Sequence, residues 1–305
     1  MIGRILGVLL GAIALVVVAV IVQHLRLSTS KPPPAKPHDT IRLATYNVHY
    51  IYLRQAEGRW GLSGWEARKE PLNQVVKVLD ADVIAFQEME SFFRGSDGSI
   101  NLTRQWLLEN NPDFAAAAIG PWREFPTTQP IFYRPDRFDV TDQGWFFFSE
   151  TPDAIYSRGF DGASPSFASW ARFADVTIGA EFRVVNVHFD AASRINRNRS
   201  AQLVAERINP WIEAGETVLL AGDLNALHGS RIHGTLESPG LSFPRVPHAS
   251  FHLDRGFHLF GAIDHIGLSG AASAVGRPFV VQWRPEEVWA SDHHPVVVDV
   301  AIPGS

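Results

Sequence analysis

The chain has 305 residues and a net charge of −5, and 46% of its residues are hydrophobic. This length is enough for one large domain, or two small ones, with a sizeable core. Cysteine is absent, which excludes disulfides, thiolate metal sites and a cysteine nucleophile. The slight acidity gives no overall attraction to nucleic acid or anionic lipid, although a local basic patch could still supply one.

The N-terminal residues 1–27 contain an apolar run from Ile5 to Val22 without any charged or strongly polar side chain. Such a run is about as long as a helix that spans the bilayer core. A cleavable secretory signal is the alternative, but its apolar part is usually shorter and no small-x-small cleavage motif follows here. We predict an uncleaved, single-pass transmembrane helix in the inner (cytoplasmic) membrane. Because it lies at the start of the chain, as export signals do, the body is expected on the periplasmic, extracytoplasmic side.

Residues 28–40 form a proline-rich segment, "STSKPPPAKPHDT". Proline and small polar residues disfavour a helix and favour an extended, semi-rigid linker. From Ile41 onward the composition is that of an ordinary folded domain, and no repeat or second linker marks another boundary. We therefore predict one domain over residues 41–305.

Short apolar runs in this domain predict strands, and two segments have the periodicity of amphipathic helices. Closely spaced strands with few helices favour α/β layers with mixed sheets, because a wholly parallel sheet needs a crossover between every strand pair. The strands are expected at 41–48, 82–88, 129–134, 169–178, 181–189, 217–225, 262–268 and 294–302, and the helices at 65–80 and 199–212.

Side chains able to bind a metal or a phosphate stand at or just beyond the ends of these strands. A turn residue that satisfies backbone groups is the simpler explanation for any one of them, but it does not explain the whole set. The set comprises Asn47, Glu88, His188, Asp223, Asn225, Asp264, Asp292 and His293.

Glu88 follows a buried strand, where a carboxylate is costly to desolvate without a cation. A hard metal ion would compensate it, and a salt bridge to an arginine is the alternative. Asp223 and Asn225 are two residues apart after a glycine, so an extended chain points both to one side. The aspartate could orient a water and the asparagine could donate to a phosphoryl oxygen, although a plain Gly-Asp turn explains the pattern too.

His188 could donate a hydrogen bond to a phosphate oxygen, although a lone histidine at a strand end is more often structural. Asp264 lies between apolar residues, and a buried carboxylate beside an imidazole fixes its tautomer and stabilises its charged form. The stretch "SDHHP" supplies the imidazole, because a bend before Pro295 would let Asp292 reach a metal while His293 meets substrate.

Other chemistries lack their motifs in this sequence. There is no Walker loop, no Gly-x-Gly-x-x-Gly after a strand, no Gly-x-Ser-x-Gly elbow and no His-Glu-x-x-His helix. Nucleotide-dependent transfer, dinucleotide redox chemistry, serine hydrolysis and zincin proteolysis are therefore disfavoured.

In chain order, "TYNVHY", "DVIAFQE", "YRPDRFDV", "VVNVHFD", "LLAGDLNA", "AIDHIGL" and "SDHHPVVVDV" resemble the signature series of the endonuclease/exonuclease/phosphatase superfamily. These are metal-dependent phosphoesterases of the pancreatic deoxyribonuclease type. The resemblance covers nearly all of residues 41–302. It implies an α/β fold, a four-layer α/β/β/α sandwich with two mixed β-sheets, here preceded by the transmembrane helix.

The resemblance also implies a role for each strand-end residue. On the metal side, which would bind Mg²⁺ or Mn²⁺, these are Glu88 as principal ligand, Asn47 as its support and Asp292 as a second carboxylate. For catalysis and substrate binding, His188 would hold a phosphate oxygen, Asp223 and Asn225 would orient the attacking water and hold the scissile phosphate, and Asp264 would pair with the catalytic His293.

Three histidines depart from the pattern of the relatives. His49 stands two residues after Asn47, where apurinic endonucleases carry an acid, which disfavours that branch and a second metal ligand from this motif. His265 stands where many relatives have an aromatic residue, and His228 follows "GDLNA", where proline or polar residues are common. His265 could touch substrate or pack against its neighbours, and we favour packing.

Together these observations predict Mg²⁺-dependent hydrolysis of a phosphate ester or phosphodiester by in-line attack of water, as in a nuclease or phosphodiesterase. Four arginines after the His188 strand would form a basic wall for a phosphate-rich substrate, with Arg199 as a substrate-binding residue; a solvated helix start explains them equally well. They are Arg194, Arg197, Arg199 and Arg207.

The class of substrate stays open at this point. A membrane anchor favours phospholipid or inositol-phosphate head groups, since tethering raises the local concentration at the bilayer. A nuclease acting on nucleic acid outside the cytoplasm is equally compatible, and no motif indicates a protein partner. A non-catalytic binding module on the same fold would be expected to lose one or more of the four central residues, yet Glu88, Asp223, Asp264 and His293 are all present.

Overall fold

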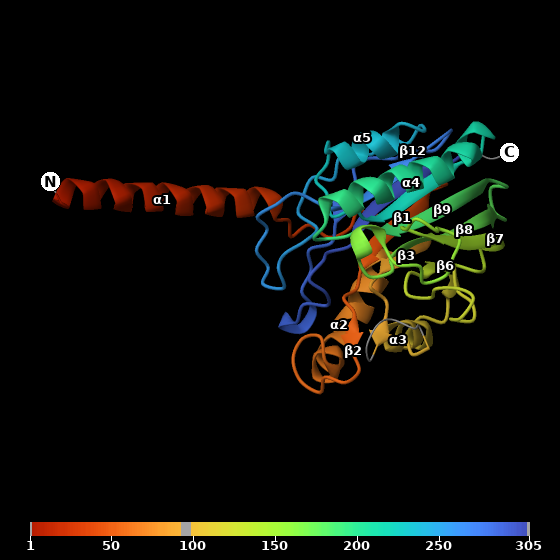
Figure 1. Cartoon of the computed structure of the whole chain (residues 1–305), viewed down its shortest axis with the longest axis horizontal. Helices are drawn as coiled ribbons and strands as arrows, with labels where there is room; N and C mark the ends of the chain where they lie inside the picture. Colours follow the sequence, from red (N-terminus) through yellow and green to blue (C-terminus); the bar gives the residue numbers. More distant parts are fainter. Residues whose placement is uncertain (1, 93–98, 304–305) are drawn as a thin grey trace.

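The computed structural model describes residues 2–92 and 99–303. Helix α1 (Ile2–Leu27) projects from the folded body as a single rod (Figure 1). Its segment Gly7–Leu27 has a mean hydropathy of 2.7 and none of it is buried. By length and composition this helix is able to cross a membrane, and a signal sequence at an N-terminus has the same properties.

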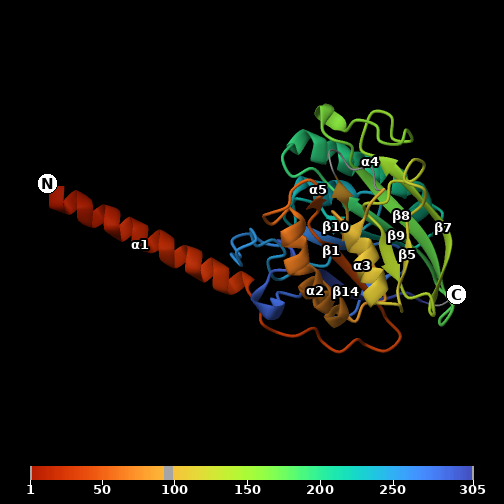
Figure 2. The same ribbon diagram turned by 90° about the horizontal axis from the view of Figure 1, so that it is seen from below.

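Residues 28–37 have no helix or strand, as their prolines predict. They follow the surface of the domain, which Figure 2 shows from below. Thr29 donates its backbone N–H to Gln282 Oε1 at 2.7 Å, and Lys36 Nζ lies 2.8 Å from Asp82 Oδ1. These contacts attach the linker to the domain instead of leaving it free in solvent.

The first sheet has seven strands in the order β12-β14-β1-β3-β6-β5, with β13 also paired to β14. β1 and β3 are parallel, whereas β14 is antiparallel to β1, so the sheet is mixed. Every residue of the central strand β1 is buried, including Arg42, whose guanidinium pairs with Asp299 at 2.7 Å. The strands are β1 (Ile41–Asn47), β3 (Val83–Gln87), β5 (Ala115–Ala117), β6 (Ile131–Tyr133), β12 (Ser273–Ala274), β13 (Phe279–Val280) and β14 (Val296–Ala301).

The second sheet has five strands in the order β11-β10-β9-β8-β7. β9 and β10 are parallel and the other pairs are antiparallel, so this sheet is mixed as well. A small parallel pair joins β2 (Ile51–Tyr52) to β4 (Ser91–Phe92). The five strands are β7 (Phe138–Phe147), β8 (Phe167–Asp175), β9 (Glu181–His188), β10 (Val218–Asp223) and β11 (Asp264–Leu268).

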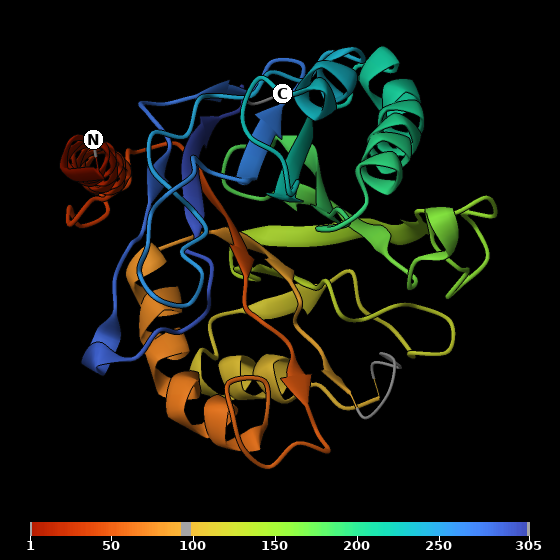
Figure 3. The same cartoon turned by 60° about the vertical axis from the view of Figure 1, so that its left-hand side comes forward.

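The two sheets pack face to face, with helices on both outer faces (Figure 3). Apolar side chains such as Leu43, Phe173 and Leu219 fill the space between the sheets. Separate apolar clusters join the first sheet to one helix pair and the second sheet to the other. The pairs are α2 (Leu62–Leu79) with α3 (Leu102–Asn110), and α4 (Arg194–Glu213) with α5 (Arg231–Glu237). This α/β/β/α sandwich confirms the predicted fold class.

The predicted helices at 65–80 and 199–212 are present as α2 and α4, each with an earlier start. The sequence does not predict strand β7, helices α3 and α5, or the strands of two or three residues, β2, β4, β5, β12 and β13. β7 is an edge strand whose middle residues are mostly exposed and polar, so no apolar run marks it. α5 has seven residues, which is too short to establish a helical period. Two short 3₁₀ helices, η1 (Phe160–Gly162) and η2 (Pro285–Glu287), complete the regular structure of the described residues.

Candidate active site

The parallel strand pairs bring polar side chains of both sheets to one edge of the sandwich. Asn47 ends β1, Glu88 follows β3, His188 ends β9 and Asp223 ends β10. The Asn47 amide nitrogen donates to Glu88 Oε1 at 3.2 Å and to Asp223 Oδ2 at 3.3 Å. His188 Nε2 lies 3.8 Å from Glu88 Oε1 and 3.6 Å from Asp223 Oδ2. Four of the predicted site residues therefore form one cluster.

A buried histidine–carboxylate pair borders this cluster. His293 Nδ1 lies 2.9 Å from Asp264 Oδ2, and its Nε2 lies 3.7 Å from Asp223 Oδ2. Asp264 is the first residue of β11 and pairs with Asp223 in the ladder between β10 and β11. Since a carboxylate only accepts, Nδ1–H donates to Asp264 and Nε2 faces the centre of the cluster.

The charges in the cluster stabilise a protonated imidazole. Burial by itself would lower the pKa of His293, but the charges of Asp264 and Asp223 raise this pKa well above the ordinary value. Burial and the charge of Asp264 raise the pKa of Asp223, while His293 and His188 oppose that rise. His293 is therefore a cationic donor at neutral pH, held in one orientation.

Close approach of β9 and β10 fixes the distance between their terminal side chains. A Cβ atom at Gly222 would lie 2.0 Å from the carbonyl oxygen of Val187, so only glycine fits here. In the next register position His188 lies opposite Asp223. The glycine of the "AGDLN" stretch thus places a histidine and an aspartate side by side.

Two site residues have left-handed backbone conformations that hydrogen bonds support. Glu88 has φ 53°, and its Oε2 accepts from the backbone N–H of Tyr50 at 3.3 Å. Asn225 has φ 45°; its backbone N–H donates to Asp223 Oδ1 and its side chain donates to the Phe189 carbonyl, both at 2.8 Å. Non-glycine residues are uncommon in this region, and it is often occupied at functional sites.

The donor set around Glu88 fits a hard divalent cation. Its carboxylate accepts from the Asn47 amide and the Tyr50 backbone, and among the described residues no lysine or arginine pairs with it. The alternative of an arginine salt bridge is therefore not seen in the described part of the chain. Asn47 turns its amide oxygen to the backbone N–H of His49 at 3.2 Å, so here it supports the carboxylates through its nitrogen.

Asp292 has an arginine partner that the sequence analysis did not identify. Arg59 Nη2 lies 3.0 Å from Asp292 Oδ2 and 3.1 Å from His49 Nε2. Burial would raise the pKa of Asp292, but the charges of His293, His49 and Arg59 outweigh burial and lower it. Arg59 lies between β2 and α2 in a loop without a motif, so only the contact reveals it.

Arg199 does not lie among these residues. It pairs with Glu150 at 2.6 Å and covers the Phe160 ring at 4.0 Å on the surface of α4. Arg207 pairs with Asp153 at 2.8 Å, and Arg197 donates to the carbonyls of Asp190 and Ala191. Two of the four arginines of the predicted basic wall, Arg199 and Arg207, are thus paired with acids.

A pocket of about 400 Å³ opens beside Glu88 and His188. Its walls come from the loops after β1, β3 and β9 and from residues around the start of β8. Besides those two residues the lining includes Tyr50, Glu90, Gln129, Ser164, Ser166, Phe167 and Asp190. The pocket therefore offers hydroxyl, amide and carboxylate groups next to the cluster.

Residues 44–293 match the model of the endonuclease/exonuclease/phosphatase family. The chain belongs to this family. Its members are phosphoesterases, so the protein is a hydrolase of phosphate esters, and the resemblance noted in its motifs is confirmed.

Solved structures of the endonuclease/exonuclease/phosphatase family have the same fold. A family protein from Bacteroides thetaiotaomicron is 26% identical, with a TM-score of 0.70 over 86% of this chain and 97% of that chain. A mannosyl-6-phosphatase from the same organism is 25% identical, with a TM-score of 0.67 over 86% and 100%. The human Nocturnin catalytic domain, at 16% identity and a TM-score of 0.58 over 87% and 96%, is similar in fold. No curated protein matches the chain.

Proposed function

We propose that this protein hydrolyses a phosphate ester or phosphodiester by in-line attack of water at a site that binds Mg²⁺, with Mn²⁺ as a substitute. The observation that supports this most directly is the convergence of Asn47, Glu88, His188, Asp223 and His293 from both sheets. Carboxylate oxygens and imidazole nitrogens thus lie within 4 Å of one another in one cluster.

Glu88 would hold the ion, supported by Asn47, with Asp292 as a second carboxylate on the metal side. The carboxylate of Glu88 is part-exposed at the pocket and free of an arginine or lysine among the described residues. A bound divalent ion supplies charge neutralisation at the phosphoryl oxygens and the leaving group. Asp292, which forms a salt bridge with Arg59 in this structure, would contribute its carboxylate on the same side.

The remaining residues would position water and stabilise developing charge. Asp223 would orient the attacking water and accept its proton, with Asn225 beside it on the same turn. His188 would donate to a non-bridging oxygen at the pocket. His293, charged and held by Asp264, would stabilise the pentacovalent phosphorus or protonate the leaving oxygen.

The pocket and the surface charges favour a compact substrate. A volume of about 400 Å³ suits a phosphorylated sugar or head group, and the acid partners of Arg199 and Arg207 reduce the positive charge that α4 offers to an extended polyanion. A similar structure is named a mannosyl-6-phosphatase, which supports a compact phosphate monoester. Sugar phosphates, inositol phosphates and phospholipid head groups are therefore proposed ahead of nucleic acid.

The apolar α1 would anchor the protein in the inner membrane, with the domain on the periplasmic side. The proposal of an anchor follows from the length and hydropathy of the helix. Protease treatment of intact spheroplasts should digest the domain. Digestion only after lysis of the inner membrane would contradict this orientation.

The activity is tested with the full chain in detergent, stripped of metal and then supplied with Mg²⁺ or Mn²⁺. The substrates are mannose 6-phosphate, inositol phosphates, phospholipid vesicles, a chromogenic monoester, a chromogenic diester, plasmid DNA and RNA. We expect metal-dependent turnover that is lost in His293→Ala and retained in His38→Ala, a substitution of an exposed linker histidine. Absence of metal-dependent turnover on every substrate, or equal activity of the two variants, would contradict the proposal.

A further inference from the structure

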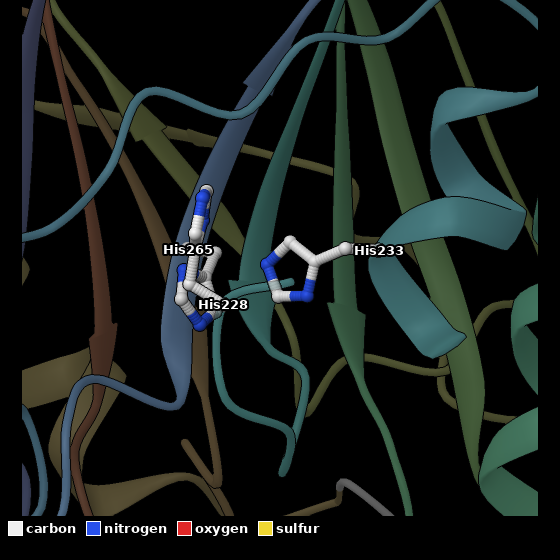
Figure 4. Close-up of side chains that lie close together, drawn as sticks. All are labelled: His228, His233 and His265. Atoms are coloured by element: carbon white, nitrogen blue, oxygen red, sulfur yellow. The ribbon is translucent and has the colours of Figure 1, made fainter. Parts of the chain in front are cut away.

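Three histidines converge on the outer side of the second sheet. They lie apart from the phosphoesterase cluster, which is the group of Asn47, Glu88, His188 and Asp223 with its neighbour His293. His228 lies in the turn after β10, His233 in α5 and His265 in β11. In Figure 4 the ring of His233 points toward His265 and His228. One ring nitrogen of each lies within 4.8 Å of the corresponding nitrogens of the other two. The rings of His233 and His265 are perpendicular, with centroids 4.4 Å apart.

Two of these rings bury a nitrogen that has no hydrogen-bond partner in the described chain. His233 is 1% exposed and His265 is 0% exposed, and the unpartnered atoms are His233 Nε2 and His265 Nδ1. An unsatisfied buried polar atom is unfavourable, so each such atom calls for an explanation. Ring stacking or packing alone, which the sequence analysis favoured for His265, leaves both nitrogens unsatisfied.

The opposite nitrogens are fixed by neighbours. His265 Nε2 lies 3.0 Å from the carbonyl oxygen of Ala226, and His233 Nδ1 lies 3.3 Å from Ser230 Oγ. Because a carbonyl only accepts, the contact with Ala226 favours the tautomer with the proton on Nε2 and a lone pair on Nδ1; the backbone of Ala262 also interacts with this ring. Metal-ligating histidines typically donate their other ring N–H to a backbone carbonyl or similar group in this way.

Burial favours the neutral form of the two buried rings, His233 and His265, which is the form that binds a metal. Burial lowers the pKa of His265 to about 3 and that of His233 to about 4. A neutral imidazole binds a metal without first losing a proton. Three imidazoles without a carboxylate in the group suit a borderline transition metal and not Mg²⁺, which prefers oxygen ligands.

We propose that His228, His233 and His265 form a second metal site, for a divalent transition metal of the Zn²⁺ class. Nitrogens around a tetrahedral Zn²⁺ at about 2.0–2.1 Å are about 3.3 Å apart. The ligand nitrogens lie within 4.8 Å of one another, so binding requires them to approach by up to roughly 1.5 Å. His228 is exposed on a turn, where its side chain can move toward the other two. The exposed side leaves a fourth position for water.

The site would connect three segments that support the phosphoesterase cluster. Successive side chains of a strand point to opposite faces, so Asp264 faces His293 while His265 faces α5. The bound ion would join β11 to α5 and to the turn that follows Asn225. It would thereby stabilise the strand that orients His293 without touching the reacting groups.

The test uses the untagged full chain in detergent, stripped of metal and held in excess Mg²⁺, which occupies carboxylate sites. Zn²⁺ binding is measured by calorimetry, and Co²⁺ reports ligand geometry through its visible absorption. We expect one Zn²⁺ per chain, a rise in the unfolding temperature and an absorption band typical of tetrahedral Co²⁺. His228→Ala should weaken Zn²⁺ binding more than about tenfold and abolish the rise in unfolding temperature.

Three further variants identify the site. His265→Phe should lose Zn²⁺ binding while filling the cavity with an aromatic ring, whereas His38→Ala should bind Zn²⁺ like the native chain. Glu88→Gln should retain Zn²⁺ binding, because that carboxylate belongs to the other centre. His228 is exposed, so its alanine variant is expected to fold. No Zn²⁺ binding by the native chain, equal binding by His228→Ala, or loss only in Glu88→Gln would overturn the proposal.

Discussion

Replacing Gly222 with alanine tests whether the close approach of β9 and β10 creates the site. The added Cβ would lie 2.0 Å from the carbonyl oxygen of Val187 and 2.7 Å from its Cγ2. Ordinary contact begins near 3.4 Å, so the strands must separate by roughly 1 Å or more. The same movement would separate His188 from Asp223, which are opposite each other one register position further along.

Both stability and turnover should respond to Gly222→Ala. Overpacking of a close-packed interior costs about 1–3 kcal/mol, equivalent to a fall of roughly 2–12 °C in the unfolding temperature of a domain of this size. A misplacement of about 1 Å in a catalytic group costs on the order of 100-fold in rate. Circular dichroism during heating measures the first effect, and kcat for a chromogenic phosphate ester measures the second.

Gly234→Ala is the matched control, because a Cβ at that position in α5 meets nothing within 4 Å. Alanine is also the better helix former, so this variant should keep or slightly raise the unfolding temperature. If Gly222→Ala unfolds at the native temperature and retains the native kcat, the reasoning from strand spacing is wrong.

Three further outcomes are expected. Asp264→Asn should lower kcat on the order of 100-fold or more and shift the basic limb of its pH profile to lower pH, since the protonated His293 loses the charge that raises its pKa; an unchanged profile would exclude this role. Glu88→Gln should abolish stimulation of turnover by Mg²⁺, measured by titrating the ion into the stripped enzyme, and normal stimulation would remove Glu88 from the metal side. Burial lowers the pKa of His252 and of His258 from 6.5 to about 4, so the unfolded chain binds more protons. The contribution of these two histidines to stability is therefore fully present above about pH 6.5 and is lost as the pH falls toward 4. An unfolding temperature that is constant over this range would contradict that linkage.

The sequence was most informative where buried strands end in polar side chains. A short apolar run ends at Asp223 and another follows His293, and both are buried strands in the structure. The pairing of Asp264 with His293 could be proposed because a buried carboxylate and an imidazole each require the other. The structure has them 2.9 Å apart although 29 positions separate them in the chain.

Contacts made by loops and edges could not be predicted in the same way. Arg59 lies in a segment without periodicity, and its partner Asp292 is 233 positions away. Arg199 looked like a substrate ligand because the sequence shows neighbouring arginines but not the acids that neutralise them, such as Glu150. A pattern of charges along one helix carries no information on which loop will fold against it.

The histidines of this protein show how one strand can serve two sites. Asp264 and His265 are adjacent in β11, and the alternation of the strand directs the first to His293 and the second to His233. Substituting His265 therefore perturbs the strand that holds Asp264, and its effect on turnover would not separate metal binding from catalysis. His228 lies in the turn before α5, outside this strand, and its ring packs near those of His233 and His265. A change in Zn²⁺ affinity on substituting His228, without a change in the pH profile of turnover, would show that the two sites are chemically separate.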